Sequence, residues 1–188
     1  MNVDHAALCS SEEWAEHIRD VVLPAAIGHL DLGSAILEVG PGYGAATRWL
    51  TTTNRKLTVL ELNDDLAAEL ESRHPEVHVS RGSGTDMSYG DDTFDAVVCF
   101  TMLHHVAPDS EQDAIFAEAF RVLRSGGHFA GSDSVANPDL AEFHQGDTYN
   151  PIDTETLAGR LAAVGFEEIG VQITGEGRLL TFDASKPS

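Results

Sequence analysis

The sequence is poor in cysteine and has no long apolar run. Its two cysteines, Cys9 and Cys99, lie far apart in a chain of 188 residues, so we expect two reduced thiols and no disulfide. The stretch from Met1 to Trp14 lacks the basic and apolar segments of a secretion signal, and no run approaches the roughly 18 apolar residues of a membrane span. These absences predict a cytoplasmic protein that neither enters nor crosses a membrane.

Basic residues are also scarce. Eleven Lys and Arg stand against 31 Asp and Glu, which gives a formal net charge of −20. The acidic residues are spread along the whole chain, and the basic residues form no run. Because such a field repels phosphate backbones, the composition predicts no nucleic-acid partner.

Short β-rich runs alternate with helical patterns along the chain. Strands are expected over residues 36–39, 57–62, 77–80, 94–100, 128–132, 169–174 and 178–182. Helices are expected over residues 12–23, where Pro24 bends or ends the helix, and over 25–30, 45–52, 63–73, 109–123 and 153–164, whereas 137–151 shows no clear period.

This alternation predicts an α/β fold. We expect a doubly wound, mainly parallel seven-stranded sheet covered on both faces, closed by a C-terminal antiparallel hairpin about Gly175-Glu176-Gly177. The length suits one domain. Within it, residues 1–34 are expected to form a helical leader that packs on or caps the core of residues 35–188.

One stretch, residues 36–50, combines a strand, a glycine turn and the start of a helix. Gly40, Gly42 and Gly44 alternate with other residues directly after the strand. Glycine allows backbone angles that side chains forbid and lets a ligand approach the main chain, so this turn is shaped for a bound molecule. Glu61 ends the next strand about 20 residues further on, where a carboxylate can hold both hydroxyls of a ribose.

Two nucleotide cofactors fit these glycines. Gly40, Gly42 and Ala45 satisfy the dinucleotide fingerprint G-x-G-x-x-G/A, which keeps a nicotinamide cofactor open. Glu38, however, places a carboxylate two residues before Gly40, which disfavours pyrophosphate and suits a cationic group. The sulfonium and ammonium of S-adenosylmethionine provide such a group.

Four sequential loops follow predicted strands and should converge on one crevice beyond their carboxyl ends. The loops begin at Gly40, Glu61, Gly82 and Phe100. This convergence is stronger evidence for a ligand site than any single motif.

The stretch Glu38-Val39-Gly40-Pro41-Gly42-Tyr43-Gly44 resembles the first motif of class I S-adenosylmethionine-dependent methyltransferases, and Glu61 resembles the acid of their second strand. The resemblance continues in order through residues 82–95, 94–106 and 121–127, and covers roughly 35–182. It implies a Rossmann-like methyltransferase fold.

The resemblance also implies a role for each cofactor residue. Gly40, Gly42 and Gly44 would line the methionine end and the ribose, Glu38 would support the amino group, Glu61 would hold the ribose hydroxyls and Leu62 would lie against the adenine. Relatives often read Gly-Asp-Ala after the third strand, whereas this chain reads Gly82-Ser83-Gly84-Thr85-Asp86. Ser83, Asp86 or the backbone of Gly84 and Thr85 could therefore supply the adenine contact.

By the same resemblance, residues from Phe100 to His105 would border the transferred methyl group. His104 or His105 could act as a base or orient a substrate. The two are adjacent, so their side chains should diverge unless the backbone is irregular, and we expect no metal site. Within residues 137–151, His144 and Tyr149 are the candidate substrate contacts.

These expectations combine into one functional hypothesis. The chain is expected to be an enzyme, a monomer or homodimer, that transfers a methyl group from S-adenosylmethionine to a small molecule and releases S-adenosylhomocysteine. Catalysis would come mainly from positioning donor and acceptor for in-line displacement. The alternatives are a nicotinamide-dependent oxidoreductase and a non-catalytic S-adenosylmethionine-binding sensor or partner protein.

Overall fold

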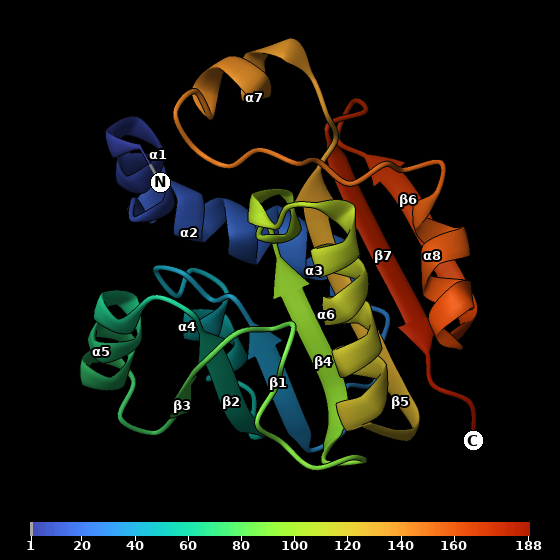
Figure 1. Ribbon diagram of the computed structural model, residues 1–188. Helices are drawn as coiled ribbons and strands as arrows, with labels where there is room; N and C mark the ends of the chain where they lie inside the picture. The colour runs from blue at the N-terminus through green and yellow to red at the C-terminus, as the bar shows by residue number, and fades with distance from the viewer. Residues whose placement is uncertain (1) are drawn as a thin grey trace.

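The predicted strands assemble into one seven-stranded sheet in the order β3-β2-β1-β4-β5-β7-β6 (Figure 1). The computed structural model describes residues 2–188. The strands are β1 (Ala35–Val39), β2 (Lys56–Glu61), β3 (His78–Arg81), β4 (Phe94–Phe100), β5 (Leu123–Ser134), β6 (Glu167–Thr174) and β7 (Leu179–Ser185). The first five are parallel, and β7 runs antiparallel to β5 and β6. The mainly parallel α/β fold with an antiparallel C-terminal pair is confirmed.

Side chains of the central strands alternate between two apolar layers, because successive residues of a strand point to opposite faces. Leu37 packs with α6 (Asp109–Val122) and α8 (Leu157–Val164), whereas Ile36 packs with the leader and with α4 (Thr47–Leu50) and α5 (Asp64–Arg73). Both side chains are fully buried. The sheet is therefore covered on both faces, which explains the nearly unbroken apolar runs of β1 and β4.

The leader is a run of short helical pieces on one face of the sheet. Ser11 caps α2 (Glu12–His17) by accepting a hydrogen bond from Trp14 N–H at 3.1 Å. A π-helical turn (Ile18–Val22) then leads into α3 (Leu23–Ile27), with Pro24 in its first turn. The buried Ile18 and Val22 pack against the residues of β1 and β2. Pro24 thus begins a helical piece, because a first-turn position needs no backbone donor.

Two short helices were not expected from the sequence, α1 (Val3–Cys9) and α7 (Pro138–Phe143). Each has an Asn cap: Asn2 accepts from His5 N–H at 2.9 Å, and Asn137 accepts from Leu140 N–H at 3.0 Å. No residue of α7 is buried, and His5 is the one buried residue of α1. With no apolar face, neither helix leaves a periodic signal, so the expectation of an irregular segment over residues 137–151 is corrected.

Within residues 2–188, no helix combines the length and the apolar character needed to cross a bilayer.

Candidate active site

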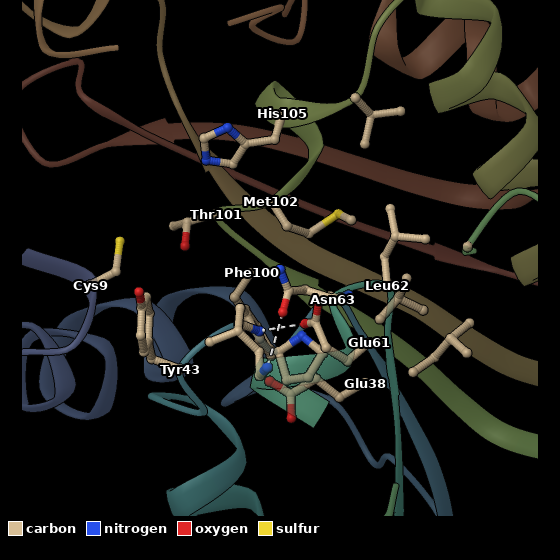
Figure 2. A pocket seen from close by; sticks show the side chains of 18 of the residues that line it. Cys9, Glu38, Tyr43, Glu61, Leu62, Asn63, Phe100, Thr101, Met102 and His105 are labelled. Atoms are coloured by element: carbon tan, nitrogen blue, oxygen red, sulfur yellow. Dashed lines mark hydrogen bonds between the residues drawn. The ribbon is translucent and has the colours of Figure 1, made fainter. Parts of the chain in front are cut away.

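A cavity of about 720 Å³ opens beyond the carboxyl ends of β1, β2 and β4. This volume is within the range of small-molecule sites. Its walls come from the glycine turn, from the loops after β2, β3 and β4, and from the leader. Figure 2 shows Glu38 and Glu61 close together on one side, with Thr101 and His105 toward the other. The four predicted loops therefore meet in one site.

The glycine turn has left-handed backbone angles, with φ of 66° at Gly40, 55° at Gly42 and 78° at Gly44. A Cβ atom at Gly40 would lie 2.8 Å from the Met102 side chain, and one at Gly44 would lie 2.7 Å from Leu70. A Cβ at Gly42 would meet no atom within 4 Å. The positive φ therefore favours glycine at all three positions, and a side chain at Gly40 or Gly44 would also displace Met102 or Leu70, whereas Gly42 leaves its space to the cavity.

Glu61 ties the glycine turn to the end of β2. Its buried carboxylate accepts hydrogen bonds from Gly42 N–H at 3.0 Å and from Asn63 N–H at 2.8 Å, and Glu61 lines the cavity. A carboxylate has about four lone-pair positions, so two positions remain for a ligand. The residue is thus placed to accept further hydrogen bonds from hydroxyl groups.

Glu38 is the second carboxylate of the cavity wall and is 2% exposed. The Thr47 hydroxyl donates a hydrogen bond to it at 2.7 Å. Burial raises the pKa of Glu38 to about 7, and repulsion from Glu61 adds to the rise. A cation bound beside the two acids would restore the ionised form, so the cavity favours a positively charged ligand.

The loop after β3 forms another wall through Ser83, Gly84 and Thr85. The Ser83 hydroxyl lies 2.8 Å from the Thr85 hydroxyl and accepts from Thr85 N–H at 3.2 Å. Asp86 is exposed and does not line the cavity, whereas Leu62 lines it and is 73% exposed. Of the residues considered for the adenine contact, Ser83, Gly84 and Thr85 line the cavity and Asp86 does not.

The segment after β4 bends sharply at the cavity. Phe100 and Thr101 line it, and Thr101 has φ of 51°, which is rare for a β-branched residue. A 3₁₀ turn (Leu103–His105) follows. His105 lines the cavity, and burial, with repulsion from His104, lowers its pKa to about 4. The His105 ring is therefore neutral at pH 7 and can accept a hydrogen bond.

His104 lies behind this wall instead of lining it. Its ring nitrogen Nδ1 is 2.6 Å from Asp133 Oδ1, and the residue is 4% exposed. The rings of His104 and His105 are 4.0 Å apart between centroids. The expectation that their side chains diverge is therefore wrong, because the chain is in a 3₁₀ turn here and not in a strand, where neighbours alternate.

The two candidate substrate contacts also lie behind the wall. His144 is 4% exposed, and its ring stacks on Tyr149 with centroids 4.6 Å apart. Neither residue lines the cavity, although the His144 ring is 5.3 Å from that of His105. The structure thus groups His144 and Tyr149 with the histidines after β4.

Several wall residues carried no sequence signal because they come from outside the motifs. The leader supplies His5, Cys9 and Trp14, and the segment after α7 supplies Asp147 and Thr148. Burial raises the pKa of the Cys9 thiol to about 11, so it is a neutral group at pH 7. The only related expectation from the sequence was that the helical leader packs on or caps the core.

The geometry agrees with the comparisons to known proteins. The family described as "Methyltransferase domain" matches residues 37–131, and the chain belongs to this family. It is 30% identical to a Mycolicibacterium smegmatis protein named "Probable S-adenosylmethionine-dependent methyltransferase", over 79% of this chain and 58% of that protein. It is 31% identical to the fatty-acid O-methyltransferase of the same species, over 73% and 49%. The chain thus spans about half the length of these relatives.

Solved structures share the fold at low sequence identity. Phosphoethanolamine N-methyltransferase 2 of Haemonchus contortus, in complex with S-adenosyl-L-methionine, matches with a TM-score of 0.76 and 15% identity, over 93% of this chain and 53% of that one. The PH0226 protein of Pyrococcus horikoshii matches with a TM-score of 0.76 and 18% identity, over 94% and 92%. The Rossmann-like methyltransferase fold is therefore confirmed.

Proposed function

We propose that this protein binds S-adenosylmethionine in the cavity and transfers its methyl group to a small-molecule acceptor. The observation that carries the proposal is the pairing of Glu38 and Glu61 beside a glycine turn in one cavity. Two carboxylates suit a cationic nucleoside and repel the pyrophosphate of a dinucleotide. Family membership supports the same reading and disfavours the nicotinamide alternative.

Each wall has a place in this proposal. Glu61 accepts from the ribose hydroxyls, and the turn around Gly42 passes along the ribose and the methionine end. Leu62 and the loop Ser83-Gly84-Thr85 lie on the adenine side. Glu38 supports the ammonium group, as its buried charge requires a cationic neighbour. The residues present therefore fit the cofactor's polar groups.

When bound, the cofactor supplies an electrophilic methyl group on a sulfonium. The chain's own contribution is to orient the two reactants and exclude water, because the leaving group departs neutral and needs no proton. Phe100 and Met102 provide apolar wall at the reacting end. His105 lines the cavity at this end, so its ring is placed to contact and orient the acceptor.

The small-molecule acceptor is supported by the acidic charge and by the names of relatives. Those relatives include a fatty-acid O-methyltransferase and, in Mycobacterium tuberculosis, a phthiotriol/phenolphthiotriol dimycocerosates methyltransferase. Both names denote small-molecule acceptors. A net charge of −20 repels nucleic acids.

Calorimetry tests cofactor binding, and a transfer assay tests turnover. We expect saturable binding of S-adenosylmethionine and S-adenosylhomocysteine, and none of NAD. Incubation with a methyl-labelled donor and small-molecule extract should label a metabolite. Absence of binding by well-folded protein contradicts the proposal, whereas binding without any transfer points to the non-catalytic alternative.

A further inference from the structure

Four histidines from three distant parts of the chain converge beside the cavity. His5 comes from α1, His104 and His105 from the 3₁₀ turn after β4, and His144 from the end of α7. One ring nitrogen from each of the four lies within 4.8 Å of the others. His5 and His105 also line the cavity wall, and His5, His104 and His144 are buried.

In each of the four rings, the Nδ1 atom is engaged by an acceptor of the protein. The Nδ1 atom of His104 lies 2.6 Å from Asp133 Oδ1, and that of His5 lies 3.3 Å from Asp147 Oδ2. The Nδ1 atom of His144 lies 2.7 Å from the Leu140 carbonyl oxygen.

The His105 Nδ1 atom makes the fourth such contact, 3.2 Å from the Thr148 carbonyl oxygen. Carbonyl oxygens and carboxylates accept hydrogen bonds, so in every ring Nδ1 is the donor. The Nε2 atoms then carry lone pairs, as metal-ligating histidines do when their other nitrogen is held by an acceptor.

The Nε2 atoms of His104 and His144 are buried and have no hydrogen-bond partner within residues 2–188. A buried polar atom without a partner is costly, and two of them on neighbouring rings of one cluster point to a shared ligand. Neutral imidazole nitrogens suit Zn²⁺ and its first-row neighbours, whereas Mg²⁺ and Ca²⁺ prefer oxygen ligands.

We propose that His5, His104, His105 and His144 bind one divalent first-row transition-metal ion, with Zn²⁺ as the best fit to four nitrogen ligands. With Zn–N distances of about 2.0–2.1 Å, tetrahedral nitrogens lie roughly 3.4 Å apart. Small rotations of the side chains bring the four atoms to that spacing. The Asp133 and Asp147 carboxylates supply compensating negative charge around the ion.

The metal would cross-link three segments that hydrogen bonds already hold together. Asn2 already links α1 to the segment after α7, through Asn2 N–H to Asp147 at 2.7 Å and the Asn2 side chain to the Phe143 carbonyl oxygen at 2.8 Å. The loop after β4 is joined to the same segment, because Asn150 N–H donates to the His104 carbonyl oxygen at 2.7 Å. The ion would reinforce both links. Four protein ligands are typical of a closed structural site, so the ion shapes the cavity wall formed by His5 and His105.

The test uses tag-free protein without any methyl donor, so its result is independent of the proposed function. The protein is freed of metal with a chelator and titrated with Zn²⁺ or with Co²⁺, whose visible spectrum reports coordination by nitrogen. The variants are His144→Gln, which removes a buried ligand, His105→Gln, which removes the half-buried one, and the control His78→Gln, an exposed strand residue.

Elemental mass spectrometry should find one metal ion per chain, and the Co²⁺ protein should show the visible absorption bands of a tetrahedral site. Saturating Zn²⁺ should raise the Tm by roughly 5–15 °C. Each ligand variant should lose more affinity than the roughly 10- to 100-fold that removal of an outer-shell partner costs, and His78→Gln should match the wild type. If the His144→Gln chain does not fold, the wild-type titration and His105→Gln still decide. Failure of the wild type to bind Zn²⁺ and Co²⁺, or unchanged binding in His105→Gln, overturns the site.

Discussion

The Thr47 hydroxyl donates a 2.7 Å hydrogen bond to the Glu38 carboxylate, at a place where Thr47 is 0% and Glu38 is 2% exposed. Burial, and then the neighbouring Glu61, raise the Glu38 pKa to about 7. The folded protein therefore keeps a proton on Glu38 that the unfolded chain releases near the ordinary pKa of 4.5. Glu38 is thus an unfavourable charge in the ligand-free fold.

This charge predicts a pH-dependent stability. The folded state binds more protons than the unfolded state between pH 4.5 and about 7, so the free energy of unfolding should fall as the pH rises through that window, by up to about 3 kcal/mol. Glu38→Gln keeps the shape and removes this contribution. Denaturant unfolding should show the variant more stable than wild type at pH 8 and equal to it at pH 4.5. An unchanged pH slope in the variant contradicts the assignment.

The same substitution should have the opposite effect on ligand binding. Glu38→Gln removes a negative charge beside the proposed ammonium group, so the Kd for S-adenosylmethionine should rise about tenfold. Calorimetry at pH 8 measures this. A variant with a higher free energy of unfolding and a higher Kd would show that Glu38 strengthens ligand binding but lowers the stability of the fold. An unchanged Kd would contradict a contact between Glu38 and the cofactor.

Glu61→Gln tests the proposed ribose contact. The amide retains one acceptor for the turn but loses the charge and the second acceptor, so the Kd for S-adenosylhomocysteine should rise roughly 10- to 100-fold, following the ~1.5–3 kcal/mol of a charged hydrogen bond. Glu167→Gln, an exposed change at the far edge strand β6, is the matched control. Equal affinities in the two variants would contradict the role of Glu61.

Gly42→Ala separates ligand clash from backbone strain. The new methyl group would meet no protein atom within 4 Å but would enter the cavity, at a φ of 55°. Gly177→Ala places a methyl group at φ of 83°, also with no atom within 4 Å, in the turn before β7. Both variants should lose about 1–2 kcal/mol of stability, but only Gly42→Ala should lose cofactor binding. Retained binding would show that nothing occupies this space.

Asp133→Asn tests how the proposed metal ligand His104 is oriented. The Asp133 carboxylate accepts from His104 Nδ1 and also from His104 N–H at 3.1 Å. Its loss should weaken Zn²⁺ binding about 10- to 100-fold and alter the Co²⁺ spectrum. Asp139→Asn, an exposed change in α7, should leave both unchanged. If Asp133→Asn lowers only the Tm of the metal-free protein, the carboxylate has a purely structural role.

Much of the fold could be read from local pattern. All seven strands were expected near their observed positions. The signal is clearest for the central strands β1 and β4, which are short, nearly unbroken apolar runs because the sheet is buried on both faces there. The glycine turn and Glu61 could be placed for a related reason. A positive φ favours glycine, and a ribose-binding acid stands at the end of a strand, so both features can be recognised from nearby residues of the sequence.

What the sequence did not reveal depends on contacts between distant segments. The exposed helices α1 and α7 have no apolar period, and β7 lies between β5 and β6 instead of extending the sheet in chain order. The histidine cluster joins residues 5, 104, 105 and 144, which have no ligand spacing along the chain. Their convergence depends on the bend at Thr101 and on the hydrogen bonds that join Asn2 to Phe143 and Asp147. These hydrogen bonds join segments far apart in the sequence, so no local pattern predicts them.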